Sequence, residues 1–129
     1  MIVLDSSALV AMLKPEADGA TLTELVSGRV DAFVPAACYL ETTMVLSAIP
    51  GARVRLDALF DEYGIVILPC DERQARLAAD AFERFGRGSG HPARLNFGDC
   101  LAYAAAAIHR APLLFKGEDF ARTDVARPG

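Results

Sequence analysis

The sequence predicts an α/β fold in which a mostly parallel sheet is covered by helices on both faces. Short apolar runs alternate along the chain with longer helix-like segments. These short runs are continuously apolar, as strands buried on both faces are. The chain has 129 residues, of which 53% are hydrophobic and 23% charged, so it can bury one sizeable core. We therefore expect a single domain over residues 1–129.

The N-terminal segment is expected to form one strand and two helices. "IVL" (2–4) is apolar and β-branched, which is typical of a buried strand. Residues 5–7 then offer capping oxygens for a helix over 8–13, which Pro15 stops. "GATLTELVSG" is predicted to form a second short helix closed by Gly28.

The middle of the chain repeats this alternation. "DAFVP" (31–35) is a predicted strand, and a long apolar helix over 36–49 follows, ended by Pro50-Gly51. Residues 53–63 have helical periodicity, and "IVILP" (65–69) is the third predicted strand.

The last third contains two longer helices and a final strand. Residues 71–85 are predicted to form an amphipathic helix. Its apolar face is expected to hold Leu77, Ala78, Ala81, Phe82 and Phe85. Residues 86–94 are rich in glycine and break the periodicity, so they are expected to form a loop. A helix containing Asp99 follows and runs to about Arg110, and "PLLF" (112–115) is the fourth strand, before a partly irregular end.

Three apolar segments each carry a single acidic residue. "MIVLDSSAL" contains Asp5, "PAACYLETTMVLSAI" contains Glu41 and "LNFGDCLAYAAAAI" contains Asp99. Glu118 and Asp119 follow the fourth strand. In open α/β sheets the functional crevice lies beyond the carboxyl ends of the strands, where strand ends and helix starts meet. We therefore expect these acids to converge at one edge of the sheet.

Each acid also has a structural alternative. Asp5 can cap a helix, and Asn96 with Asp99 three residues later resembles an N-cap with an acid at position N3. Glu41 can be a solvated helix residue, and Asp119 can be an ordinary surface residue. The argument for a site therefore depends on the joint pattern.

Converging carboxylates indicate a cation site. Like charges within a few ångströms raise each other's pKa values, and burial adds to the shift, so the arrangement gains little stability by itself. Oxygen ligands suit Mg²⁺ or Mn²⁺ better than zinc, and the two histidines, His91 and His109, are far apart in the sequence. Such a metal can activate water and clamp the oxygens of a phosphodiester.

The charge balance excludes a general electrostatic binder of nucleic acids. The net charge is −4 and the sequence pI about 5.1. A small set of basic residues can still position RNA through its phosphates, although the alternative is a solvated loop. These candidates are Arg84, Arg87, His91, Arg94 and Lys116.

The cysteines and the hydropathy pattern predict a cytoplasmic protein. Cys38, Cys70 and Cys100 are odd in number and lack CxxC spacing, so we expect buried free thiols in a reducing compartment. No apolar run approaches membrane-spanning length, and the N-terminus lacks the basic region of a signal peptide.

Several of these segments together resemble a known family. "MIVLDSSALVAML" resembles the opening of PIN-domain ribonucleases, especially the VapC-type toxins of bacterial toxin–antitoxin pairs. "LNFGDCLAYAAA" followed by "PLLFKGEDFARTDV" is similar to the C-terminal half of that family, and "LE" at 40–41 matches its middle acid. One departure is Glu118, where the family often has Asn.

The resemblance implies a PIN-like three-layer α/β/α sandwich with a central, mostly parallel sheet of four to five strands. It also implies a Mg²⁺- or Mn²⁺-dependent endoribonuclease. The implied catalytic acids are Asp5, Glu41, Asp99 and Asp119. Asp5 and Asp99 are the expected metal ligands, with Glu41 and Asp119 as further candidates. Asp124 competes with Asp119 for the fourth position, and Ser7 and Asn96 are expected to support the cluster.

The same resemblance implies partners. A VapB-type antitoxin would place a basic side chain in the acid pocket, which is physically reasonable because guanidinium groups pair well with carboxylates. The resemblance further implies a homodimer. Single-stranded RNA is the expected substrate.

Two other functions are compatible with parts of the pattern. An aspartyl-phosphate phosphatase also begins with an Asp after the first strand, but it usually has a second Asp two residues on, where this chain has Ser7. A non-catalytic PIN-like scaffold that only binds a partner is the third alternative.

Overall fold

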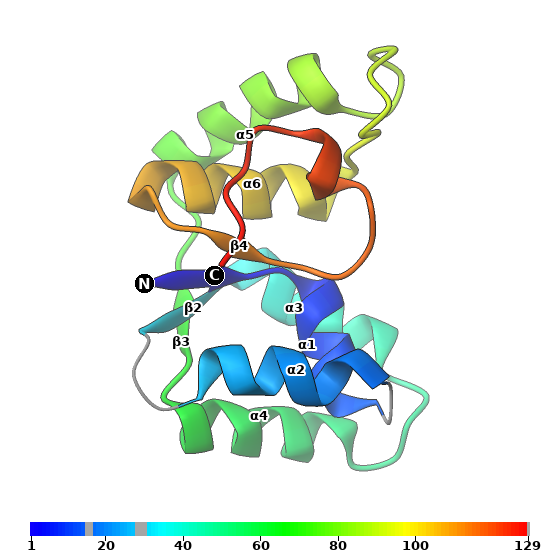
Figure 1. The fold of residues 1–129 in the computed structure, drawn as a ribbon, viewed down its shortest axis with the longest axis vertical. Helices are drawn as coiled ribbons and strands as arrows, with labels where there is room; N and C mark the ends of the chain where they lie inside the picture. The colour runs from blue at the N-terminus through cyan, green and yellow to red at the C-terminus, as the bar shows by residue number, and fades with distance from the viewer. Residues whose placement is uncertain (15–16, 28–30, 129) are drawn as a thin grey trace.

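The computed structural model describes residues 1–14, 17–27 and 31–128. Strands and helices alternate along it (Figure 1). In chain order they are β1 (Ile2–Leu4), α1 (Ser6–Leu13), α2 (Ala17–Val26), β2 (Ala32–Pro35), α3 (Ala36–Val45), α4 (Ala52–Tyr63), β3 (Val66–Leu68), α5 (Glu72–Phe85), α6 (Phe97–His109), β4 (Leu113–Leu114) and the 3₁₀ helix η1 (Phe120–Arg122).

The four strands form one parallel sheet in the order β3-β2-β1-β4. In its register, Val3 of β1 lies opposite Phe33 of β2 and Leu113 of β4. Helices α5 and α6 lie on one side of the sheet, and α1, α2 and α4 lie on the other (Figure 1). This arrangement confirms the predicted three-layer fold with a sheet of four strands.

The core lies between the sheet and its two helical layers. All three residues of β1 are buried, as expected for the strand flanked by two others. The buried face of α6 includes Ala102, Ala104, Ala105 and Ala106. Such small side chains let α6 pack closely against the sheet, and this packing places its first turn at the carboxyl edge of β1.

Two helices differ from the prediction. The helix predicted over 36–49 ends at Val45, and the chain then forms turns up to Gly51. Pro50 disfavours helical backbone at Ile49, the predicted last residue, but the helix ends four residues earlier. In α5 the buried residues are Gln74, Ala78, Ala81 and Phe85. Phe82 was predicted on this face but is 49% exposed, because it lies beside the strip of buried residues and not within it.

The cysteine prediction is correct at two of three positions. Cys38 and Cys100 are buried free thiols, whereas Cys70 is exposed. Cys70 follows β3, which is an edge strand of the sheet. The predicted breaks at Pro15 and Gly28 lie outside the described residues. No helix in the described ranges is both long and apolar enough to cross a membrane.

Candidate functional site

Acidic side chains from four segments meet beyond the carboxyl end of β1. Asp5 directly follows β1, Glu41 lies in the middle of α3, Asp99 is in the first turn of α6 and Asp119 follows β4. One oxygen each of Asp5 and Glu41 and the Sγ atom of Cys38 lie within 4.8 Å of one another. The Asp99 carboxylate interacts electrostatically with Asp5, Asp119 and Glu41. The structure therefore places Asp5 and Glu41 in one close group, and Asp99 and Asp119 lie near enough for Asp99 to interact electrostatically with all three other acids.

The Asp5 carboxylate is buried and held at both oxygens. Oδ2 accepts hydrogen bonds from the Ser7 amide at 3.1 Å and from the Ser7 hydroxyl at 2.7 Å. The Ser7 oxygen in turn accepts from the Lys116 amide at 3.0 Å, so the hydroxyl proton is directed toward Asp5. The Cys38 thiol lies 3.8 Å from Oδ1. Asp5 is thus the helix cap of α1 and a member of the cluster at the same time.

Glu41 is fixed by two neighbours that the sequence did not indicate. The Ser6 hydroxyl donates to Oε1 of Glu41 at 2.5 Å. On the other side, a Cβ atom at Gly98 would lie 2.7 Å from Oε2. Only glycine leaves room for this close approach of α6 to the carboxylate. The solvated alternative for Glu41 is therefore wrong, because the side chain is half-buried and bonded within the cluster.

Asp99 is held by a reciprocal capping arrangement at the start of α6. Its amide donates to Oδ1 of Asn96 at 2.9 Å, and the Asn96 amide donates to Oδ2 of Asp99 at 3.0 Å. This is a capping box, which satisfies two amides of the helix N-terminus. Asn96 thus supports the cluster by orienting Asp99.

The cluster shifts the pKa values of its members. Burial, and then the nearby charges of Asp5, Asp119 and Glu41, raise the pKa of Asp99 to about 6. Burial chiefly raises the pKa of Asp5 as well, against the lowering effect of the Ser7 hydrogen bonds. These shifts show that the ionised cluster is energetically costly without a compensating cation.

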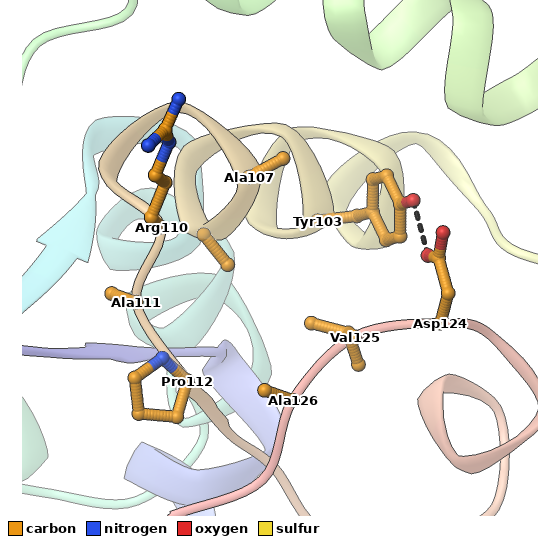
Figure 2. A pocket seen from close by; sticks show the side chains of 9 residues that line it. Tyr103, Ala107, Arg110, Ala111, Pro112, Asp124, Val125 and Ala126 are labelled. Carbon is orange, nitrogen blue, oxygen red and sulfur yellow. Dashed lines mark hydrogen bonds between the residues drawn. The ribbon is translucent and has the colours of Figure 1, made fainter.

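The fourth acid position can be compared directly at Asp119 and Asp124. Asp119 is exposed and within electrostatic reach of Asp99. Asp124 instead accepts a hydrogen bond from the Tyr103 hydroxyl and forms an ion pair with Arg84 at 3.3 Å. Figure 2 shows Asp124 facing Tyr103 beside a cavity of about 320 Å³. The Tyr103 hydrogen bond is the main reason that the pKa of Asp124 is lowered. The geometry favours Asp119.

The basic residues divide into two groups. Arg87, Arg94 and Lys116 are exposed, and the Lys116 amide contacts the Ser7 hydroxyl beside the cluster. Arg84 pairs with Asp124, and its guanidinium also lies over the Phe85 ring, 4.5 Å from its centre.

His91 has a structural role in the loop. Its Nδ1 accepts the Ala93 amide at 3.0 Å, and its ring packs edge-on against Phe85. Arg84 and His91 therefore have partners within the chain itself.

Three functional neighbours escaped sequence reasoning: Ser6, Cys38 and Gly98. Ser6 and Gly98 flank predicted acids in the chain, which is a usable signal, but their contacts to Glu41 cross 35 residues or more. Cys38 lies three residues before Glu41, on the face of α3 that packs against Asp5. Burial and the charges of Asp5 and Glu41 raise the pKa of its thiol. It therefore remains a neutral donor.

The arrangement suits a hard divalent cation. Ser7 donates to one oxygen of Asp5, and the Asn96 amide donates to one oxygen of Asp99. The other Asp5 oxygen has only the weakly donating Cys38 thiol beside it, at 3.8 Å. This leaves the cluster with separate oxygens on different side chains, which are the ligands that Mg²⁺ and Mn²⁺ take in proteins.

Comparisons with known proteins agree with this geometry. The family model of the PIN domain matches residues 2–126. Ribonuclease VapC28 of Mycobacterium tuberculosis is 47% identical over 128 residues, covering 98% of this chain and 96% of that protein. Among solved structures, the Sarcin-Ricin loop cleaving toxin VapC20 of the same species has a TM-score of 0.75 at 19% identity, covering 98% of this chain and 97% of its own. A toxin–antitoxin complex from Klebsiella pneumoniae has a TM-score of 0.73 at 15% identity, covering 94% and 91%.

Proposed function

The chain belongs to the PIN-domain family, and on this premise we propose that it is a metal-dependent endoribonuclease, the toxin of a VapBC-type toxin–antitoxin pair. The observation that carries the proposal is the close approach of the Asp5 and Glu41 carboxylates, with Asp99 and Asp119 within electrostatic reach of one another and Asp99 within reach of both. The name of VapC28 supports the ribonuclease activity, and the close identity supports its transfer to this chain.

Asp5 and Asp99 would hold the ion, with Glu41 and Asp119 completing the set. A bound Mg²⁺ or Mn²⁺ supplies charge neutralisation and an acidified water for attack on a phosphodiester. The chain contributes orientation, because Ser7, Ser6 and Asn96 fix three of the carboxylates before substrate arrives. Exposed Asp119 lies at the rim, where it can accept a proton from a water molecule near the scissile bond.

The substrate is single-stranded RNA. Exposed Arg87 and Arg94 and the exposed Lys116 side chain can take phosphates around the acidic mouth. Arg84 and His91 are further candidates; Arg84 forms an ion pair with Asp124, and the His91 ring accepts the Ala93 amide. Unpaired RNA fits this kind of site, since its backbone can bend to reach recessed carboxylates.

A VapB-type antitoxin is the proposed protein partner. Carboxylates that repel one another would be stabilised by an arginine from the partner, which competes with the metal for the same oxygens. A homodimer is supported by the exposed apolar residues of α3, which are Leu40, Met44 and Val45. The pair would act in the cytoplasm, where RNA substrates are present.

The test is RNA cleavage by the purified chain, with Mg²⁺ or with EDTA. Asp99→Asn should lose at least about 100-fold in rate, since even positioning residues around metals contribute about 10- to 100-fold. The matched control is Asp61→Asn on the exposed part of α4, which removes one carboxylate outside the cluster. Equal cleavage by Asp99→Asn, or undiminished cleavage in EDTA, would contradict the proposal.

A further inference from the structure

An apolar groove runs between α5 and the first turns of α6. Its walls include Ala75, Ala78 and Phe82 of α5 and Phe97, Cys100 and Leu101 of α6, and its volume is about 490 Å³. That volume lies in the range of small-molecule sites. Phe97 is 81% exposed and Phe82 is 49% exposed. Two exposed aromatic residues on the walls of one groove indicate a binding site more strongly than a single exposed apolar residue does.

The groove and the acid cluster both involve the first turn of α6. Phe97 is the first residue of α6, and the next residue, Gly98, lies directly against the Glu41 carboxylate. Asp99 follows it. The charge of Asp99 also reaches the Cys100 thiol in the groove wall. Phe97 thus lies two residues before Asp99 in the first turn of α6, so an RNA strand bound at the carboxylates can reach the groove.

The lining of the groove selects a neutral, flat ligand. None of its lining side chains is charged, and they include two phenylalanines, a leucine, alanines and cysteines. A phosphate would find no positively charged side chain to bind there. A nucleobase has an apolar π-face that stacks on aromatic rings, and stacking does not depend strongly on which base is present. Recognition of single-stranded RNA commonly uses bases that are splayed out in this way.

We propose that this groove receives one unstacked base of the RNA substrate, with the Phe97 ring as its stacking surface. The inference rests on the proposed ribonuclease function and specifies how the site holds its substrate. Phosphates next to that base would then lie toward the carboxylates, so Phe97 sets which phosphodiester is presented for cleavage.

The test measures binding without cleavage. In an Asp99→Asn background with Mg²⁺, a short single-stranded RNA carries the fluorescent base 2-aminopurine at each position in turn. Stacking on Phe97 should quench the fluorescence at one register. Adding Phe97→Ala should abolish this quenching and weaken binding about 5- to 150-fold, the range of one lost base stack. Phe97→Trp should preserve both, and Phe97→Leu should lose the quenching.

An RNA that lacks the base at that register provides the decisive comparison. On this abasic RNA, Phe97→Ala should have no effect on affinity, because there is nothing left to stack. Val54→Ala, at a 74% exposed residue of α4, is the control for loss of an exposed apolar side chain and should bind like its parent. Unchanged quenching in Phe97→Ala, or equal losses on intact and abasic RNA, would overturn the inference.

Two further outcomes separate the proposals. If Phe97→Ala alters the sedimentation of the protein while RNA affinity is unchanged, the groove is a protein interface and the inference is wrong. If the wild-type chain cleaves RNA and Phe97→Ala cleaves it with the same kcat/KM, the inference alone fails. If the wild-type chain cleaves no RNA, the proposed function fails, and the fluorescence result decides the base site by itself.

Discussion

Replacing Asp99 by Asn tests whether burial of this carboxylate and its repulsion by neighbouring acids destabilise the folded protein. In the structure, burial and the charges of Asp5, Asp119 and Glu41 raise the pKa of Asp99 to about 6. Asparagine has nearly the same shape and keeps an oxygen that can accept the Asn96 amide, so the capping box survives. The substitution therefore removes the charge and little else.

The magnitude follows from the pKa shift. A rise from 3.8 to about 6 corresponds to about 3 kcal/mol at most, and we reduce this to about 1–2 kcal/mol because Asp99 is partly exposed to solvent. The folded state holds this proton more tightly than the unfolded state does. The free energy of unfolding of the metal-free wild type therefore falls as the pH rises from about 4 to 6. Above pH 7 the Asn variant should be more stable by that amount.

Thermal unfolding in EDTA measures this difference. At pH 7.5 the Tm of Asp99→Asn should exceed that of the wild type by about 4 to 8 °C, and the gap should narrow as the pH falls toward 4. Adding Mg²⁺ at pH 7.5 should raise the Tm of the wild type and leave the variant nearly unchanged. A variant that is less stable than the wild type in EDTA at pH 7.5 would refute the electrostatic reasoning.

Four other substitutions have distinct expected outcomes. Gly98→Ala should push the Glu41 carboxylate aside and lower the cleavage rate at least tenfold. The free energy of unfolding should change by less than about 1 kcal/mol, because the Glu41 side chain is flexible. An unchanged cleavage rate would show that the contact is dispensable. Ser7→Ala loses the hydrogen bond at 2.7 Å, so it should lower the cleavage rate about 10- to 100-fold and the free energy of unfolding in urea by about 1 kcal/mol. A wild-type cleavage rate would contradict this. Asp119→Asn should impair cleavage, whereas Asp124→Asn should retain it and lose about 1 kcal/mol of stability; the reverse pattern would exchange their roles.

The positions of the acids were predictable because they depend on local features. Asp5 follows a short apolar run that can only be a buried strand, and Asp99 lies three residues after a good N-cap. The parallel arrangement of alternating strands and helices then brings such residues to one edge. The structural interpretation of these residues is confirmed, since each carboxylate accepts capping hydrogen bonds, and their role as metal ligands stays a prediction.

The contacts around these acids were not predictable in the same way. The hydroxyl of Ser6 and the bare Cα of Gly98 act on Glu41 across long stretches of sequence. The end of α3 and the exposure of Phe82 depended on how neighbouring helices meet, which hydrophobic periodicity does not record. The choice between Asp119 and Asp124 needed the position of the C-terminal segment relative to Tyr103.

The place of β1 between β2 and β4 has a consequence for the newly made chain. As the ribosome extends the polypeptide, β1 and β2 emerge early, but β4, the second neighbour of β1, is made only after β3, α5 and α6. The Lys116 amide that reaches Ser7 arrives 109 residues after its acceptor. A nascent or prematurely released fragment that ends before β4 therefore lacks one side of the acidic mouth.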